Sequence, residues 1–360
     1  MAYVNTACPH DCPSTCAIEV EKLSDKEIGR VRGASENTYT AGVICSKVAR
    51  YAERAHHPER LMTPLRRNGP KGSGDFVPIS WDDALDEVCE SLIKTEQRAG
   101  SESVWPYYYA GTMGLVMRDG LNRLRHAKRY SGEHQTICVN LAFSGFLAGA
   151  GQMTGVDPRE MEDSDAIVIW GTNAAVTQIN VMTHALKARR QRNAKIVVVD
   201  TYKNATAKQA DIFLCVRPGT DGALACAIMH QLFKEKLADW EYLDQFTDYP
   251  EELQKHLEDK GPKWASNICG IPEREIIDIA HLLGNTPKTF YRLGYGFTRH
   301  RNGASNMHAV ASIPAVTGAW KYKGGGALMN NSGIYHWNKT LIEGLDVLDS
   351  SIRMLDQSRI

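Results

Sequence analysis

The stretch Cys8-Pro9-His10-Asp11-Cys12-Pro13-Ser14-Thr15-Cys16, joined later by Gly42-Val43-Ile44-Cys45-Ser46-Lys47, decides how this chain begins to fold. Its cysteines follow the spacing C-x3-C-x3-C-x28-C. A cubane iron–sulfur cluster needs one thiolate for each of its irons, and three close cysteines with a distant fourth can supply them from two turns. The two prolines oppose helix formation in the loop. The pattern therefore predicts a [4Fe–4S] cluster bound by four cysteines, Cys8, Cys12, Cys16 and Cys45.

The same cysteines are compatible with a zinc site, with disulfides or with ordinary buried thiols. Tetrahedral zinc is often held by four cysteines, but usually from two pairs rather than from three and one. Disulfides require an oxidising compartment, and no signal peptide precedes the loop. Ordinary buried thiols would not need this spacing.

The composition limits what the chain can be. It has 360 residues, 43% of them hydrophobic, which is enough for two or three domains. Lys plus Arg and Asp plus Glu are both 42, so the formal net charge is zero and nothing favours nucleic acid as a partner. No run approaches the roughly 18 apolar residues of a membrane span. With no leader and no twin-arginine motif, a cytoplasmic location is expected.

After the cysteine loop, the sequence predicts first a small β unit and later an α/β sheet. Residues 17–23 alternate like a strand, and residues 28–33 are its expected hairpin partner. The runs at 166–170, 194–200, 212–216 and 289–293 are mostly apolar, as buried parallel strands are, and helical segments separate them. This order predicts a doubly wound, Rossmann-like sheet.

The carboxyl ends of such parallel strands are where ligands bind. Those ends are predicted at residues 171–173, 200–201 and 217–221. Between the two regions, we expect a helix from residue 81 to about 99, a strand over 104–109, and a segment rich in small residues over 142–151 that lets a backbone approach something bulky.

The cysteine loop with its Gly-Val-Ile-Cys-Ser-Lys partner resembles the cluster domain of the molybdopterin oxidoreductases, the dimethyl-sulfoxide-reductase superfamily. The resemblance continues in Ile79-Ser80-Trp81-Asp82-Asp83-Ala84, Trp170-Gly171-Thr172-Asn173 and Arg217-Pro218-Gly219-Thr220-Asp221. It implies an α/β fold with a small β-rich [4Fe–4S] domain, followed by Rossmann-like dinucleotide-binding domains. It also implies molybdenum or tungsten held by two molybdopterin guanine dinucleotides.

By this resemblance, individual residues acquire expected roles. Lys47 is expected between the cluster and the pterin, although its charge alone is equally consistent with a solvated helix residue. The expected dinucleotide contacts follow the strands: Asn173, Asp200, Thr201, Gly219, Asp221, Gly294 and Gly296. Thr201-Tyr202 stands where many members have Pro-Arg.

The metal's protein ligand is Cys, selenocysteine, Ser or Asp across this family. Cys138 has the position of the ligand in formate dehydrogenases, and a soft thiolate suits the metal. A buried structural cysteine is the alternative, and Val139 stands where the formate enzymes have histidine. Asn140 and Ser144 are the next candidates.

The resemblance also predicts domains and function. We expect a cluster domain at 1–58, an α/β domain at 59–135 that continues in 330–360, and a Rossmann-like domain at 136–329. Nothing after Gly326 predicts the family's C-terminal β-barrel, so the chain is expected to be an N-terminal part of a longer polypeptide or a truncated product. The expected activity is two-electron oxidoreduction of a small molecule, with an iron–sulfur electron-transfer subunit as partner. The alternative is a non-catalytic electron-transfer subunit that has lost the metal.

Overall fold

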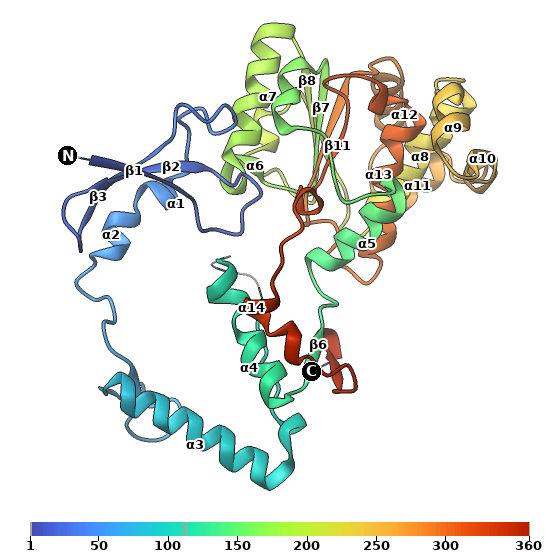
Figure 1. The fold of residues 1–360 in the computed structure, drawn as a ribbon. Coiled ribbons are helices and arrows are strands. Elements are labelled where there is room, and N and C mark those ends of the chain that lie inside the picture. The colour runs from blue at the N-terminus through green and yellow to red at the C-terminus, as the bar shows by residue number, and fades with distance from the viewer. Residues whose placement is uncertain (1, 110, 112–113, 360) are drawn as a thin grey trace.

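The structure is a computed structural model that describes residues 2–109, 111 and 114–359 (Figure 1). Its first unit is an antiparallel sheet in the order β1-β2-β3. The alternation of β2 buries Ile18, and that of β3 buries Val31, against Cys16 and Val48. The expected hairpin therefore forms, and β1 adds a third strand at its edge. The elements of this unit are β1 (Ala2–Ala7), β2 (Ala17–Lys22), β3 (Ile28–Gly33), α1 (Ser46–Ala49) and α2 (Tyr51–Ala55).

The central sheet has five strands in the order β11-β10-β7-β8-β9, and every neighbouring pair is parallel. The chain builds β7, β8 and β9 outward and then returns to place β10 and β11 on the other side of β7. This reversal of strand order between β7 and β10 is the point where open α/β sheets bind ligands. The strands are β7 (Ala166–Trp170), β8 (Lys195–Asp200), β9 (Ile212–Cys215), β10 (Thr289–Leu293) and β11 (Gly326–Leu328).

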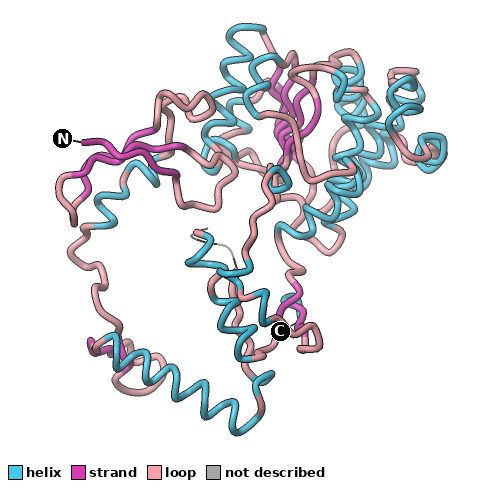
Figure 2. Tube along the Cα trace, in the orientation of Figure 1, coloured by secondary structure: helices cyan, strands magenta, loops and turns pink. Residues whose placement is uncertain are grey.

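Helices cover both faces of this sheet, which Figure 2 shows as the bundle of strands between two layers of helix. Val168 and Val197 point to the face packed by α8 and α13, and Ile167 and Ile196 point to the face packed by α7. The apolar runs of the sequence are thus buried on both sides. The helices of this region are α5 (Val139–Ala150), α6 (Ala174–Thr177), α7 (Ile179–Arg192), α8 (Asp221–Lys234), α9 (Trp240–Phe246), α10 (Pro250–Leu257), α11 (Pro262–Cys269), α12 (Glu273–Gly284) and α13 (Gly303–Val316).

A smaller group of elements joins residues far apart in the chain. The last strand, β12 (Met354–Asp356), pairs in parallel with β6 (Gly132–His134), and α14 (Thr340–Glu343) packs on α4 (Leu121–Lys128). The remaining hairpin is β4 (Leu65–Arg67) with β5 (Phe76–Pro78). Short helical turns are η1 (Ser101–Ser103), η2 (Leu115–Asp119), η3 (Pro158–Asp163), η4 (Ala207–Gln209), η5 (Ala319–Lys321), η6 (Ser332–Ile334), η7 (Leu345–Val347) and η8 (Gln357–Arg359).

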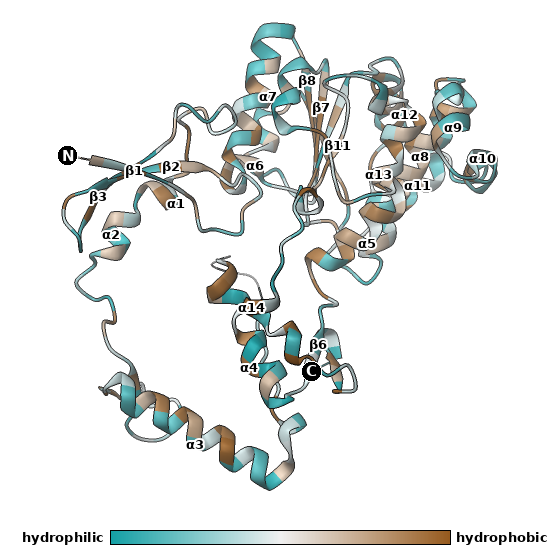
Figure 3. Cartoon of the chain, viewed as in Figure 1, coloured by the Kyte–Doolittle hydropathy of each residue, from teal (hydrophilic) through white to brown (hydrophobic). Residues whose placement is uncertain are grey.

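Helix α3 (Trp81–Ala99) extends away from the sheet domain and contacts the chain mainly near its C-terminal end, where Glu96 pairs with Lys128 and accepts from Tyr130 Oη. Its start was predicted, and the Ser80 hydroxyl accepts a hydrogen bond of 3.0 Å from the backbone N–H of Asp83. None of its residues is buried, although hydrophobic residues recur along it (Figure 3). Trp81, Leu85 and Val88 are all more than half exposed.

One expectation about local structure was wrong. Residues 104–109 form no strand: the Val104 carbonyl accepts a hydrogen bond of 3.0 Å from the Ser131 N–H, but the described residues have no strand ladder along this run. Helix α5 begins at Val139, so Cys138 lies directly at a helix start. Within the residues that the structure describes, no helix is both long enough and apolar enough to cross a membrane.

Candidate functional site

The four cysteines of the N-terminal unit line one cavity. Cys8, Cys12 and Cys16 come from the loop between β1 and β2, and Cys45 precedes α1. Thr177 and Ile179, from α6 and α7, close the cavity from the side of the large sheet. The cavity therefore lies where the two parts of the chain meet.

The chemistry of this donor set fits a positively charged metal core. Burial and the three neighbouring thiols raise the pKa of Cys16 to about 12, and burial raises the pKa of Cys8. Thiols that resist ionisation become thiolates when they coordinate a metal ion. In the described residues, no three His, Cys, Asp or Glu side chains gather around a single ion. A [4Fe–4S] cluster takes one thiolate on each of its four irons, which four cysteines can supply.

Polar contacts hold the cysteine unit against the sheet domain. The buried Asn180 side chain, on α7, donates to the carbonyl oxygens of Tyr39, Thr40 and Val43, and accepts from Cys16 Sγ at 3.1 Å. Each of these contacts joins α7 to the small N-terminal unit. The cavity wall is therefore formed jointly by the two parts of the chain.

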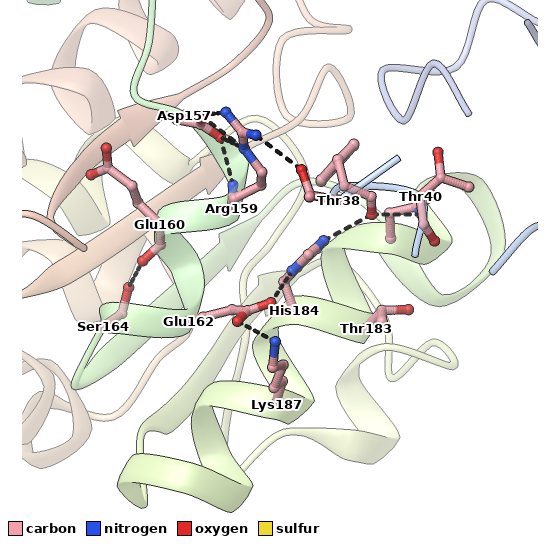
Figure 4. Close-up of polar contacts among 12 residues, drawn as sticks. Thr38, Thr40, Asp157, Arg159, Glu160, Glu162, Ser164, Thr183, His184 and Lys187 are labelled. Atoms are coloured by element: carbon pink, nitrogen blue, oxygen red, sulfur yellow. Dashed lines mark hydrogen bonds and ion pairs between the residues drawn. The ribbon is translucent and has the colours of Figure 1, made fainter. Parts of the chain in front are cut away.

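Figure 4 shows a second set of contacts at the same junction. His184 Nε2 donates to the Tyr39 carbonyl at 2.9 Å, and its Nδ1 lies 2.7 Å from Glu162 Oε1. Glu162 also pairs with Lys187, and Arg159 Nη1 donates to Thr38 Oγ1 at 2.9 Å. The loop of residues 38–40 is thus fixed on η3 and α7.

Lys47 also lines the cysteine cavity. Its Nζ donates to the Val176 carbonyl oxygen at 2.7 Å, so the ammonium group bridges from the N-terminal unit to α6. The structure places this cation next to the four cysteines, on the side facing the sheet.

The predicted dinucleotide residues all lie at the carboxyl edge of the sheet. Asn173 follows β7, and its Oδ1 accepts from Thr206 Oγ1 at 2.9 Å. Asp200 ends β8 and accepts from the Thr201 N–H at 2.7 Å and from Asn204 Nδ2 at 2.8 Å. These groups are therefore held in fixed orientations beside the crossover between β7 and β10.

Asp221 carries an unsatisfied buried oxygen. Its side chain is 1% exposed, and Trp170 Nε1 donates to Oδ1 at 2.8 Å. Its Oδ2 has no hydrogen-bond partner in the described part of the chain. Burial, together with the nearby Asp200, raises the pKa of this carboxyl to about 6. A buried acceptor without a donor fits a ligand that brings N–H groups to it.

Three glycines let the ends of β7 and β10 touch. A Cβ at Gly294 would overlap the Gly171 carbonyl oxygen, and one at Gly296 would come within 2.6 Å of it. Gly171 has φ +65°, and a Cβ there would overlap Phe297. Gly219, also predicted, has φ +80° and lies near His300. For Gly294 and Gly296, the observed role is backbone contact within the sheet edge.

Cys138 is held in an unusual backbone conformation. It precedes α5 with φ 56° and ψ −112°, a region that residues other than glycine rarely adopt. Tyr109 and Tyr295 both lie close enough for a Cys138 thiolate to raise their pKa values, although burial is the larger cause. Tyr295 immediately follows Gly294, so Cys138 lies near the carboxyl edge of the sheet.

Two features differ from what the sequence indicated. The small residues of α5 pack on α13, since a Cβ at Gly145 would overlap the Ala304 carbonyl oxygen.

The segment after Gly296 makes contacts with the predicted site that the sequence did not lead us to expect. Asn302 Nδ2 donates to the Gly219 carbonyl at 2.9 Å, and Asn306 Oδ1 accepts from the Gly222 N–H at 3.1 Å. The polar run at 298–303, directly after a predicted glycine turn, was the available signal.

Comparisons with known proteins agree with this arrangement. Residues 60–356 match the family model of the molybdopterin oxidoreductases, and residues 1–57 match the molybdopterin oxidoreductase Fe4S4 domain. The chain is 38% identical to "Probable oxidoreductase YoaE" of Bacillus subtilis over 95% of its own length and 50% of that protein. It is 28% identical to the dimethyl sulfoxide reductase DmsA of Haemophilus influenzae, over 89% of its own length and 44% of that protein.

A solved structure shows the same fold. Acetylene hydratase from Pelobacter acetylenicus superimposes with a TM-score of 0.70 and 24% identity, over 88% of this chain and 43% of that one. The chain spans about half the length of the curated relatives it matches. The two family matches together extend over nearly all of it, and the chain therefore belongs to the molybdopterin oxidoreductases.

Proposed function

We propose that this chain holds the [4Fe–4S] cluster and the molybdenum or tungsten bis(molybdopterin guanine dinucleotide) of an oxidoreductase acting on a small molecule. The observation that carries the proposal is the single cavity lined by Cys8, Cys12, Cys16 and Cys45, at the junction with the sheet. A cluster there would lie beside the carboxyl edge at which doubly wound sheets bind dinucleotides.

The chain's own residues would hold these groups. When bound, the metal supplies two-electron redox chemistry, and the cluster passes electrons singly. Lys47 places a cation beside the cluster cavity, and Asp221 offers an unsatisfied acceptor to the N–H groups of a guanine. Cys138 is the proposed protein ligand of the metal, supported by its strained backbone at the start of α5.

We propose the domain division 1–58, 59–135 with 330–360, and 136–329. The pairing of β12 with β6 supports it, because it joins the last residues described to the segment before residue 135. An iron–sulfur subunit is the proposed electron partner. The substrate is proposed only as a small molecule.

Metal analysis after anaerobic purification tests the cluster. We expect about four irons per chain and a broad visible absorption, both lost in Cys16→Ser. Cys89→Ser is the matched control, since Cys89 is exposed on α3 and distant from the cavity in the chain. Stoichiometric zinc without iron would contradict the proposal.

The same analysis separates the enzyme from an electron-transfer subunit without a second metal. Molybdenum or tungsten found together with iron in the longer protein containing this chain supports the enzyme. Iron alone, under growth conditions that supply both metals, supports the non-catalytic subunit.

A further inference from the structure

Asn180, the second residue of α7, is completely buried against the cysteine unit. Its Nδ2 lies 3.2 to 3.3 Å from three backbone carbonyl oxygens, those of Tyr39, Thr40 and Val43. An amide nitrogen offers hydrogens to such oxygens, whereas an amide oxygen in the same place would face three acceptors without a donor. The loop of residues 39–43 therefore fixes the side-chain amide of Asn180 in one orientation.

This orientation determines which atom of the amide faces the cysteine cavity. Asn180 Oδ1 lies 3.1 Å from the Sγ of Cys16, and Cys16 lines the cavity. As a thiol, Cys16 donates its hydrogen to this oxygen. A thiolate bound to iron has no hydrogen to donate, so the negative end of the amide dipole would then lie against a negatively charged sulfur.

A second cysteine of the cavity has a similar neighbour. Cys12 Sγ contacts the backbone carbonyl oxygen of Thr177, which also lines the cavity and lies three residues before Asn180. The N–H group that reaches Cys12 Sγ, at 3.5 Å, belongs to Ser14 of the cysteine loop itself. The connection from α6 to α7 thus presents oxygen atoms to two of the four sulfurs.

We propose that Asn180 lowers the reduction potential of the [4Fe–4S] cluster. The inference rests on the proposed function, because it requires the cluster to be bound by the four cysteines. Reduction adds one electron to an assembly that four thiolates already make negative, and a fixed dipole whose oxygen faces a ligand sulfur opposes that addition. Because Asn180 is buried, little water is present to screen the dipole. Lys47 and a bound dinucleotide also affect the potential, but neither changes when Asn180 alone is replaced.

The test is a dithionite titration of the cluster in the purified longer protein, followed by electron paramagnetic resonance. Asn180→Leu removes the amide dipole at similar volume. Asn180→Ser removes the same dipole and leaves room for a water molecule beside the three carbonyl groups. We expect a higher midpoint potential than in the wild type for both variants, with the iron content unchanged.

His184→Leu is the matched control for a loosened loop. His184 lies one turn further along α7 and donates to the Tyr39 carbonyl at 2.9 Å, and its other hydrogen bond goes to Glu162 and not to a cysteine. This variant weakens the attachment of the same loop but leaves the amide of Asn180 in place. The cluster potential should stay the same or fall, because any charge that the imidazole carries is positive.

Each other result has a distinct meaning. Equal potentials in the wild type and the Asn180 variants would overturn the inference, and lower potentials would do so as well, because Asn180 would then donate an N–H group to the sulfur. A rise of the same size in His184→Leu would assign the effect to the loop and not to the dipole. If neither Asn180 variant holds a cluster while the wild type and His184→Leu do, Asn180 is a structural support and the tuning role is overturned. A wild-type protein without a cluster would refute the proposed function instead.

Discussion

Replacing Asp221 by Asn should stabilise the cofactor-free chain at neutral pH. The carboxyl has a pKa of about 6 in the folded chain against 3.8 ordinarily, because burial opposes its ionisation. This difference lowers the free energy of unfolding by about 3 kcal/mol above pH 6, where Asp221 is ionised in both the folded and the unfolded chain. Asn keeps an oxygen for Trp170 Nε1. The NH2 group of the Asn side chain would have no acceptor, which costs about 1 kcal/mol. The free energy of unfolding should therefore rise by about 2 kcal/mol in net terms.

The sign of the pH dependence follows from the raised pKa. The folded chain binds the Asp221 proton more tightly than the unfolded chain does. The stability that this provides is complete below about pH 4 and is lost as the pH rises through about 6. The advantage of the Asn variant should therefore be absent near pH 4, grow between about pH 4 and 6, and stay constant above that.

Urea unfolding of both forms between about pH 4 and 8 measures this difference. Asp82→Asn, which changes an exposed first-turn aspartate of α3, is the control and should shift stability by less than about 1 kcal/mol at every pH. A variant that is destabilised equally at all pH values would refute the reasoning. In the loaded protein the same variant should retain less dinucleotide, because an amide N–H group would face the guanine's donors.

Three further predictions each concern one substitution. Lys47→Met should leave the iron content unchanged and slow electron exchange between cluster and metal in stopped-flow reduction; equal rates would contradict the role of its charge. Gly294→Ala should cost about 1–3 kcal/mol in thermal or urea unfolding, because its Cβ would meet the Gly171 carbonyl oxygen. Gly114→Ala should not, because among the described residues that are not its chain neighbours the nearest atom to its Cβ is 3.6 Å away. Cys138→Ser in the longer protein should change catalysis and the metal's paramagnetic signal while the iron–sulfur signal stays the same, and an unaltered metal signal would make Asn140 or Ser144 the next candidate.

The sequence was most informative where one local pattern determines the structure. β7 is apolar throughout and β8 is apolar between its two charged ends, since both faces of a covered parallel sheet are buried. Ser80 marks the start of α3 through its side-chain oxygen. The cysteine spacing likewise indicated a shared site because three of the four cysteines that line the cavity lie in one loop.

The sequence was uninformative where the local structure depends on a residue far away in the chain. The aromatic run 104–109 has strand-like composition, but a strand needs a continuous ladder of backbone bonds. The Val104 carbonyl accepts from the Ser131 N–H, whereas the Tyr108 carbonyl accepts from the Gln357 side chain. The glycines of α5 gave no sign that α13 was their partner. Arg292 interrupts an apolar strand, and only its three-dimensional surroundings distinguish a buried charge from an exposed one.

The exposure of α3 has a consequence for the local dynamics of the chain. A helix without buried residues opens by its own helix–coil equilibrium and not with the core. Its amide hydrogens should therefore exchange with deuterated water much sooner than those of β7 and β8, whose residues are almost all buried. Any protein segment that packs on Trp81, Leu85 and Val88 would slow this exchange, so the exchange rate of α3 reports whether that apolar surface is covered.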